Sequence, residues 1–540
     1  MGKALHAMIW LRLLLAGGIV APVLAGLVLT LAMALRPEAS GFAVAGIATS
    51  LRLTLVTGVG ATLLSVGLSV PLSLWLLPKA RARAWLAPFL AVPHATLALG
   101  LAFLIAPSGW LVRLVWPLDL PPAIVTVGDP WGLSLMLGLV LKEVPFLTLV
   151  TLAAAAQHLL EAHFAAGQSL GYPRSQIWRQ VVWPMLYPAL RLPVFITLAF
   201  SLSVVDMALL LGPSHPPTLA VQILRLFTAT DPDARFAAAR LAIGLLLVTG
   251  GAVAVWRGAE VVTARLLLNR LRKGMRRVPR GAGGAAIGVS GLILGGAAVL
   301  VLALWSVARR WPFPAVLPEQ MTFVGWQQLV WAQTAGETLL IGLAATVISL
   351  VLALIWLEAE DRSGSRMRGG ALIVITPLLL PQISFLQGVA QGFLWLGVPA
   401  GRMAVIWAEI LFVFPYVMIA ITGPWRAMDA QQLAAAASLG AGPMRRFWRV
   451  KLSLMLRPLL TAAAIGFAVS CAQFLAVLLP GAGRVQTLAT EAVALASGAD
   501  RRLSALYGLV LALLPLLAYG LALGVPAWVH RDRRGMRGER

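Results

Sequence analysis

The chain has 540 residues, of which 60% are hydrophobic and only 12% charged, and its mean hydropathy is +0.88. This composition excludes an ordinary soluble protein and indicates a helical protein that crosses a membrane many times. The net charge of +23 does not indicate nucleic-acid binding, because Lys and Arg lie in short segments between apolar stretches, as expected of cytoplasmic loops. The single cysteine, Cys471, excludes an intrachain disulfide and does not favour a thiol-ligated metal site.

The first half of the chain, residues 1–256, is expected to cross the membrane six times, because a helical span needs roughly 20 apolar residues. Its first apolar stretch is too long for the h-region of a cleaved signal peptide and begins with basic residues, which places the N-terminus in the cytoplasm. The proline-rich loop 108–132 has one basic residue and is expected outside. The expected spans are 11–35, 49–77, 85–107, 133–155, 191–212 and 236–256.

Residues 257–283 are expected to form a basic cytoplasmic linker, because their arginines far outnumber the single acid, Glu260. The second half, 284–540, repeats the six-span pattern and ends in an arginine-rich tail, which places the C-terminus in the cytoplasm as well. The predicted fold is therefore an all-α membrane protein with about twelve transmembrane helices in two tandem repeats. The expected spans of the second half are 285–308, 336–357, 370–393, 402–423, 459–480 and 504–528.

Matched residues in corresponding spans support an internal duplication. Because each half has an even number of spans, the two repeats are expected to be parallel and related by an axis along the membrane normal, with a pathway between them. The glycines among these residues are expected to let helices pack closely. The matched pairs include Thr54 and Thr338, Gly58 and Gly342, Thr62 and Thr346, Ser65 and Ser349, Pro93 and Pro381, and Gly100 and Gly388.

One amphipathic element occurs in both halves, at 161–190 and at 432–459. Each copy predicts a short helix that ends at a glycine, Gly171 or Gly440, because glycine readily adopts the left-handed conformation that closes a helix. A second, basic helix then begins at Pro173 or Pro443, since proline suits a first helical turn. Such an element is suited either to docking on a partner or to lying on an anionic membrane surface.

The sequence of this element resembles the EAA cytoplasmic loop found in permeases of type I, binding-protein-dependent ABC importers. The shared pattern is Ala-Ala-x-x-Ser-Leu-Gly, followed after about ten residues by Val-x-x-Pro. In this chain Ala165 and Ala434 stand where the family has a glutamate, and Pro184 has no counterpart in the second copy. The matching residues are Ala165, Ala166, Ser169, Leu170, Gly171, Val181 and Pro184 in the first copy, and Ala434, Ala435, Ser438, Leu439 and Gly440 in the second.

The resemblance implies a type I ABC importer permease fold in which the segments 157–190 and 426–459, here named the first and second docking loops, each seat in one ATPase subunit. It also implies a separate extracytoplasmic solute-binding protein and a location in the bacterial inner membrane. No cofactor is implied. The fused layout and the pattern from Asp206 to Thr218-Leu219-Ala220 resemble the thiamine and ferric-iron permeases most closely.

Polar residues inside the expected spans are candidates for lining the pathway, because burying a charged side chain in a bilayer costs about 2.5–3.5 kcal/mol. Asp206 aligns with Gln473 in the other half, and Ser203 and Ser470 lie three residues before them on the same helical face. An alternative role for these four residues is hydrogen bonding between helices that joins the two halves.

The predicted function is thus the permease of an ATP-driven importer of a small solute, with ATP hydrolysis on separate chains. The only Gly-Lys pair is Gly2-Lys3, so the chain has no P-loop and is not itself expected to be an enzyme. An ion-coupled secondary transporter of the major-facilitator kind is the alternative, because it also has twelve spans in two parallel halves. That alternative does not account for two matching cytoplasmic loops.

Overall fold

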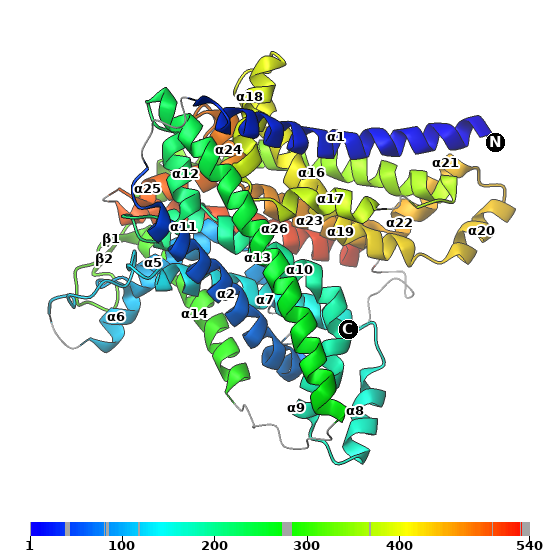
Figure 1. Cartoon of the computed structure of the whole chain (residues 1–540), viewed down its shortest axis with the longest axis horizontal. Coiled ribbons are helices and arrows are strands. Elements are labelled where there is room, and N and C mark those ends of the chain that lie inside the picture. The colour runs from blue at the N-terminus through cyan, green and yellow to red at the C-terminus, as the bar shows by residue number, and fades with distance from the viewer. Residues whose placement is uncertain are drawn as a thin grey trace.

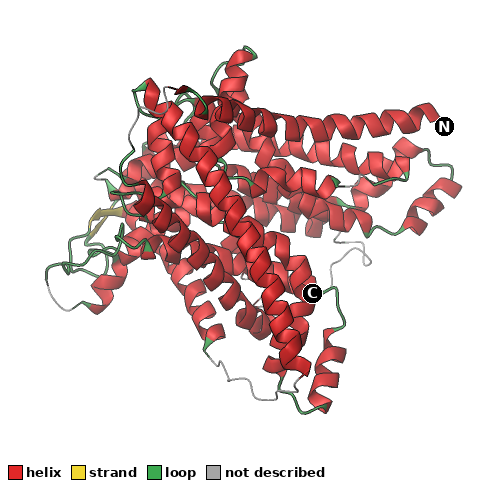
Figure 2. Ribbon diagram, viewed as in Figure 1, coloured by secondary structure: helices red, strands yellow, loops and turns green. Residues whose placement is uncertain are grey.

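The computed structural model of the chain is almost entirely helical (Figure 2) and describes residues 2–37, 44–79, 82, 86–116, 119–272, 283–366, 369–498, 500–529 and 531. Among these residues, ten helices are long and apolar enough to cross a membrane, and twelve spans result if two bent helix pairs each count as one. Each span overlaps an expected one, although the fifth and eleventh begin more than ten residues earlier, and the prediction of an all-α, multi-span membrane protein is confirmed.

The first half supplies six spans and several short helices. Pro145 and other prolines lie inside its helices, as is common where neighbouring helices can satisfy the freed backbone groups. The elements are α1 (Gly2–Ala34), α2 (Ile47–Leu76), α4 (Leu86–Ala91), α5 (His94–Ile105), α6 (Trp110–Val115), α7 (Leu133–Ala155), α8 (Leu160–Ser169), α9 (Arg174–Ile177), the π-helical turn η2 (Trp178–Val182), α10 (Trp183–Ser203), α11 (Asp206–Leu211), α12 (Leu219–Phe227) and α13 (Pro232–Arg272).

The second half repeats this order, with a short antiparallel β-hairpin after its first span. The elements are α14 (Gly284–Val307), β1 (Ala308–Arg310), β2 (Gln320–Met321), α15 (Val324–Gln327), α16 (Val330–Ser363), α17 (Gly370–Leu379), α18 (Ile383–Trp395), α19 (Arg402–Arg426), α20 (Ala430–Ser438), α21 (Pro443–Arg446), the π-helical turn η3 (Phe447–Lys451), α22 (Leu452–Leu454), α23 (Leu456–Cys471), α24 (Leu475–Gly481), α25 (Leu488–Ala496) and α26 (Arg501–Val529).

Equivalent hydrogen bonds recur in the two halves. In the first half, the side-chain oxygen of Thr54 accepts a bond from the backbone N–H of Leu219 at 2.9 Å, which fixes the start of α12 against α2. In the second half, Thr338 accepts from the N–H of Leu488 at 2.9 Å and fixes α25 against α16 in the same way. The matched threonines therefore have the same structural role, because each accepts a hydrogen bond from the start of a helix, where the first N–H groups lack partners within the helix.

The two halves interlock through their first spans. Helix α1 packs along α18 of the second half, and α14 packs along α5 of the first half. At each crossing a glycine allows the backbones to touch: a Cβ on Gly388 would overlap the carbonyl of Gly26, and one on Gly100 would overlap the carbonyl of Ala298. Matched side-chain bonds also cross between the halves, from Thr96 to the Gly508 carbonyl at 3.1 Å and from Ser384 to the Ala242 carbonyl at 2.7 Å.

Four spans that are expected to be continuous are broken. The first half breaks between α4 and α5, at Val92–Pro93, and between α10 and α11, at Val204–Val205. The second half breaks between α17 and α18, which meet at 99°, and between α23 and α24. Exposed backbone at membrane depth is tolerated only where protein covers it or where it lines a cavity, so these breaks point to a cavity in the middle of the molecule.

The linker also differs from expectation. Its first part, 257–272, continues α13 as a helix, and Glu260 accepts hydrogen bonds from Tyr187 and Arg191 in α10. Residues 273–282 of the linker and 532–540 of the tail lie outside the described residues.

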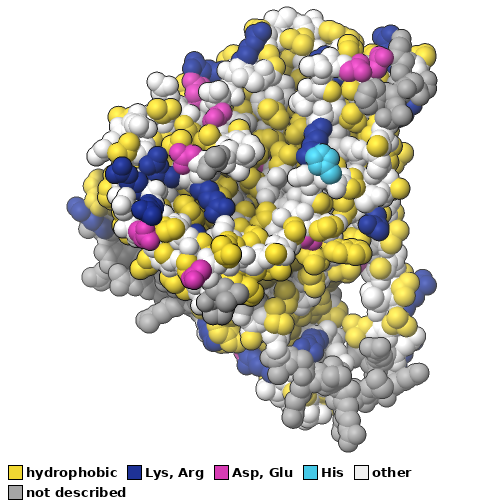
Figure 3. All heavy atoms as spheres, turned by 90° about the vertical axis from the view of Figure 1, so that its left-hand side faces the viewer, with side chains coloured by type: hydrophobic (Ala, Val, Ile, Leu, Met, Phe, Trp, Pro, Cys, Tyr) yellow, Lys and Arg dark blue, Asp and Glu magenta, His cyan; other side chains and the backbone are white. Residues whose placement is uncertain are grey.

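The helices of the two halves diverge toward the side that carries α8–α9 and α20–α21 (Figure 1). The opposite side carries α6 and the β1–β2 hairpin, and there apolar side chains are interspersed with charged ones (Figure 3).

Candidate functional site

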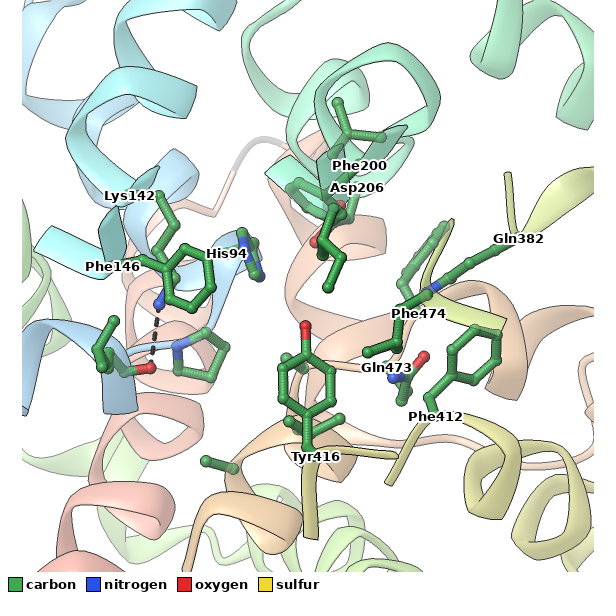
Figure 4. Close-up of a pocket in the computed structure, with 18 of the residues that line it drawn as sticks. His94, Lys142, Phe146, Phe200, Asp206, Gln382, Phe412, Tyr416, Gln473 and Phe474 are labelled. Atoms are coloured by element: carbon green, nitrogen blue, oxygen red, sulfur yellow. Dashed lines mark hydrogen bonds between the residues drawn. The ribbon is translucent and has the colours of Figure 1, made fainter. Parts of the chain in front are cut away.

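A cavity of about 350 Å³ lies between the two halves, where all four helix breaks converge. Helices α5, α7 and α10 line it from the first half, and α17, α19 and α23 line it from the second. Figure 4 shows Lys142, Phe146 and His94 on one side of the cavity and Gln382, Phe412, Gln473 and Phe474 on the other. A volume near 350 Å³ is at the lower end of the range for small-molecule sites, roughly 300–1,000 Å³.

Lys142 in α7 is buried and bonded to backbone carbonyls. Its ammonium group donates to the carbonyls of Phe89 and Leu90 at 3.1 Å each, and also to that of Val92. These carbonyls lie at the end of α4, where a helix leaves its last C=O groups without partners, so Lys142 stabilises the break before Pro93. All three N–H groups of the ammonium are thereby engaged.

Glu143, the next residue, points to different partners, as neighbouring residues on a helix should. Its carboxylate accepts a hydrogen bond from Thr197 in α10 at 2.9 Å, and its other oxygen lies 3.9 Å from His94 Nε2. The His94 ring packs against Phe200, with the ring centroids 4.5 Å apart. These contacts join α5, α7 and α10 around one wall of the cavity.

Asp206 begins α11, directly after the break at Val204–Val205, and it is buried while lining the cavity. Figure 4 shows the phenol oxygen of Tyr416, from α19 of the second half, directed toward Asp206. Gln473 occupies the corresponding break of the second half and also lines the cavity. The structure thus brings the matched pair Asp206 and Gln473 to one cavity.

The two candidate serines are placed differently from each other. Ser203 lines the cavity, and its hydroxyl donates to the Ala199 carbonyl at 2.7 Å within its own helix. Ser470 is not among the lining residues, because its hydroxyl donates to the buried carboxylate of Glu409 in α19. Ser470 therefore joins α23 to α19 within the second half, so this bond is interhelical but does not join the two halves.

Aliphatic side chains make up most of the cavity wall, but six aromatic rings also line it, and sequence reasoning did not identify them. Nothing in the spacing of these residues distinguishes them from other aromatic residues in apolar spans. Proximity to the prolines at two of the breaks, Pro93 and Pro381, is the one sequence signal that could have drawn attention to this region. The rings that line the cavity are Phe146, Phe200, Phe412, Tyr416, Phe474 and Tyr519.

Both predicted docking loops form a helix, a glycine turn and a second helix, as the sequence predicts. Gly171 has φ +83° and Gly440 has φ +79°, and in each copy the residue after the glycine donates back across the turn. The bonds run from Tyr172 N–H to the Gly167 carbonyl at 3.1 Å and from Ala441 N–H to the Ala436 carbonyl at 3.0 Å, the pattern of a Schellman motif.

The first docking loop is folded onto the helices of its own half. Trp178 is 0% exposed, stacks on Phe164 with the ring centroids 6.5 Å apart, and donates to the Val70 carbonyl in α2 at 2.9 Å. Arg174 pairs with Glu161 at 3.0 Å on the outer surface. This loop therefore has an apolar core of its own.

The second docking loop is held mainly by charges. Trp448, which matches Trp178 in sequence, is 62% exposed, and α20 has no buried residue. Instead Lys451 reaches back to α16 and contacts the carboxylates of Glu358 and Asp361 at 2.6 Å each. The two matching tryptophans thus differ, because Trp178 is buried and Trp448 is exposed.

All the candidate docking residues lie at the surface. Figure 1 places both loops on the same side of the molecule as the N-terminus. The exposed residues are Ala165, Ser169, Leu170 and Gly171 in the first loop, and Ala434, Ser438, Leu439 and Gly440 in the second. None of these side chains is buried in the core, so they are accessible to a partner protein.

No group of three or more His, Cys, Asp or Glu side chains that could hold a metal ion occurs among the described residues. Cys471 is buried next to the α23–α24 break.

Comparison with known proteins identifies the family, although no family model matches. The chain is 34% identical over 485 residues to the inner membrane ABC transporter permease protein YnjC of Escherichia coli, which covers 90% of this chain and 88% of that protein. It is 29% identical over 171 residues to the molybdenum transport system permease protein ModB of Azotobacter vinelandii, over 29% of this chain and 75% of that protein. A spermidine/putrescine transport system permease protein PotC homolog of Mycoplasma pneumoniae is 25% identical over 187 residues, which is 34% of this chain and 65% of that protein.

Two matching helical halves with a cavity between them are an arrangement found in many membrane transport proteins. The chain belongs to the permeases of ABC transporters and carries two permease halves in one polypeptide.

Proposed function

We propose that this chain, with its two permease halves, forms the transmembrane part of an ATP-driven importer of a small solute. One observation carries the proposal: each predicted docking loop runs through a π-helical turn directly into a helix that lines the cavity. The first loop continues through η2 into α10, which ends at Ser203 just before Asp206. The second continues through η3 and α22 into α23, which ends just before Gln473. A force applied to either loop therefore moves cavity-lining residues of its own half.

In this proposal, two ATPase subunits lie on the cytoplasmic side, one on each docking loop. They hydrolyse ATP, whereas the permease chain does not. Their closure draws the two diverging sets of helices together and so changes which side of the membrane the cavity faces. Because Ala165 and Ala434 replace the usual glutamate, docking relies on shape and apolar contact around Leu170, 65% exposed, and Leu439, 88% exposed.

The proposed division is a first permease repeat at 1–256, a linker at 257–283 and a second repeat at 284–540. Both termini and the linker lie in the cytoplasm of a bacterial cell, because basic residues concentrate there. In this proposal the end with α6 and the β1–β2 hairpin, which lies opposite the docking loops in Figure 1, faces outward and receives solute from an extracytoplasmic binding protein.

The proposed solute is small, and thiamine-like compounds and ferric iron are the classes that the fused layout suggests. The names of the related permeases refer to molybdenum, to spermidine and putrescine, and to sulfate. Because these solutes differ in charge, the names of the relatives do not indicate one solute class for this chain. The class is instead inferred from the residues that line the cavity.

Co-purification tests this proposal. The chain is expressed with its candidate ATPase, with and without the double change Gly171→Asp, Gly440→Asp, which strains both left-handed turns without meeting any atom within 4 Å. We expect the double variant to insert in the membrane but to lose the ATPase and its stimulated ATP hydrolysis.

The matched control is Gly397→Asp. Gly397 has φ +74°, nothing within 4 Å and the same hydrogen-bonded turn after α18, but it lies far along the chain from both docking loops. Retention of the ATPase by this control is expected. A wild-type chain that binds no ATPase and transports solute alone on an ion gradient would instead support the secondary transporter.

A further inference from the structure

We propose that the cavity between the halves is a solute-binding site within the permease, and that its ligand class is a ring-bearing organic cation. This inference rests on the proposed importer function and adds the chemistry of what the importer carries. It also means that the permease holds the solute during transport, in addition to any capture by an external binding protein.

The charges that line the cavity favour a cation. Two carboxylates, Asp206 and Glu143, face it together with one lysine, Lys142. All three N–H groups of Lys142 are engaged by the carbonyls of α4, so this ammonium has no donor left for an anionic ligand. Counted as formal charges with His94 neutral, the lining residues therefore carry one net negative charge, and they offer no ammonium group with a free donor.

Of the two carboxylates, Asp206 is the one available to a ligand. Glu143 already accepts a bond from Thr197 and lies beside His94. Asp206 forms no ion pair with Lys or Arg within 4 Å in the part of the chain that the structure describes, although it is buried and lines the cavity. It accepts a hydrogen bond from the backbone of Met207, and His94 and Lys142 act on it only through space. A buried carboxylate without a cation in direct contact is costly, and a positively charged ligand would supply that contact.

The aromatic rings favour a flat organic body over a bare ion. Phe200 and Tyr416 approach the cavity from opposite halves, and Phe146 and Phe474 flank it (Figure 4). Such rings offer both stacking faces and cation–π attraction to a ring-bearing cation. The amides of Gln382 and Gln473 add neutral donors and acceptors for polar substituents.

Helix ends do not reverse this preference. Helices α5 and α18 begin at the cavity and direct their positive ends toward it. The preceding helix, α4 or α17, ends at the same break. Its negative C-terminal end offsets the positive N-terminal end of α5 or α18. A ferric ion is also disfavoured, because no group of three or more His, Cys, Asp or Glu side chains suited to a metal exists among the described residues.

The test measures binding by the purified full chain in lipid nanodiscs, without ATPase. The probes are thiamine, benzyltrimethylammonium, tetramethylammonium, molybdate and ferric citrate, and the readout is isothermal titration calorimetry. We expect the two ring-bearing cations to bind, tetramethylammonium to bind more weakly, and molybdate and ferric citrate not to bind.

Substitutions then locate the site. Asp206→Asn and Phe200→Leu are each expected to weaken binding of the ring-bearing cations by about tenfold or more, since each removes one of the two attractions. Asp119→Asn is the matched control, because it removes one exposed external carboxylate outside the cavity lining and should leave binding unchanged. Size-exclusion chromatography confirms that each variant remains folded.

Several outcomes would overturn the inference. These are binding of molybdate or ferric citrate in preference to the cations, absence of binding by every probe, and cation binding that Asp206→Asn leaves unchanged. The importer function is tested separately by ATPase co-purification. A chain that retains its ATPase but binds no organic cation would refute the proposed ligand class and leave the importer function intact.

Discussion

The backbone carbonyl of Gly26 occupies the place that a side chain on Gly388 would need. Gly26 lies in the first span of the chain and Gly388 in the second half, so this contact closes one of the two crossings that interlock the halves. Its counterpart is the contact between Gly100 and the carbonyl of Ala298. At both crossings the atoms that a new Cβ would meet belong to the backbone. A methyl group therefore cannot be accommodated by rotation of a side chain.

Gly388→Ala is therefore expected to destabilise the folded chain by about 1–3 kcal/mol, the usual cost of overpacking a tight contact. The measurement is thermal unfolding of the purified protein in detergent. Gly392→Ala, one turn later in α18, is the control, because its added methyl would meet only Leu29 at an ordinary 3.4 Å. Equal melting temperatures for the two variants would contradict the close crossing.

The matched tryptophans should respond differently to the same change. Trp178→Ala is expected to cost about 3–5 kcal/mol, because it empties a fully buried site and leaves the Val70 carbonyl without its donor. Trp448→Ala should change stability by less than about 0.5 kcal/mol, as most exposed substitutions do. Thermal unfolding of the two variants side by side checks this, and a large loss for Trp448→Ala would show that the second loop is packed.

If Trp448 faces an ATPase, Trp448→Ala should weaken ATPase binding while leaving the fold intact. Co-purification of the variant with the ATPase measures this effect. The comparison is informative because Trp178 and Trp448 are the same residue in equivalent sequence positions.

Lys142 should be needed to hold the break between α4 and α5. Lys142→Met keeps the length of the side chain but leaves the Phe89, Leu90 and Val92 carbonyls without their charged donor. We expect a loss of several kcal/mol, because each buried polar group left unpaired costs about 1–3 kcal/mol. Lys79→Met, at an exposed lysine, is the control and should unfold close to the wild-type temperature.

Asp129, in the loop before α7, should make stability depend on pH. Burial alone would raise the pKa of its carboxyl, but hydrogen bonds from the N–H groups of Ser134 and Leu133, from the Ser134 hydroxyl and from the N–H of Trp131 outweigh burial and lower it from 3.8. A depressed folded-state pKa means that the stabilisation is fully present above pH 3.8 and is lost as the pH falls through the lowered pKa.

The difference in melting temperature between wild type and Asp129→Asn should therefore be largest near neutral pH and shrink in acid. The exposed Asp119→Asn serves as the control and should show no such trend. A difference that stays constant between neutral pH and about pH 3 would mean that the Asp129 pKa is not shifted by folding.

Much of the fold could be predicted because a bilayer imposes strong rules. Apolar runs of sufficient length located the spans, and the glycines and prolines of the repeated element located the turns at Gly171 and Gly440. Pairs such as Thr54 and Thr338 were matched from sequence alone and make equivalent hydrogen bonds.

Other features were inaccessible because they depend on partners far away in the chain. The break at Val204–Val205 contains neither proline nor glycine, so nothing local interrupts the helical pattern there. The burial of Trp178 and the exposure of Trp448 depend on the helix surfaces around each one, which the Trp-Arg pair that they share cannot reveal. Ser470 was expected beside Gln473 at the pathway, but the carboxylate of Glu409 engages it instead.

The exchange of first spans between the halves has a consequence for how the protein is made. Helix α1 leaves the ribosome first, but its packing surface on α18 is synthesised only after most of the second half's early spans. Until α18 is synthesised, α1 lies in the membrane without the close contact between Gly26 and Gly388. Assembly therefore finishes only when the late helices arrive. A truncated first half would keep the packing of α1 on α13 but would leave the α18-facing side of α1 uncovered, for the membrane's quality-control proteases to recognise.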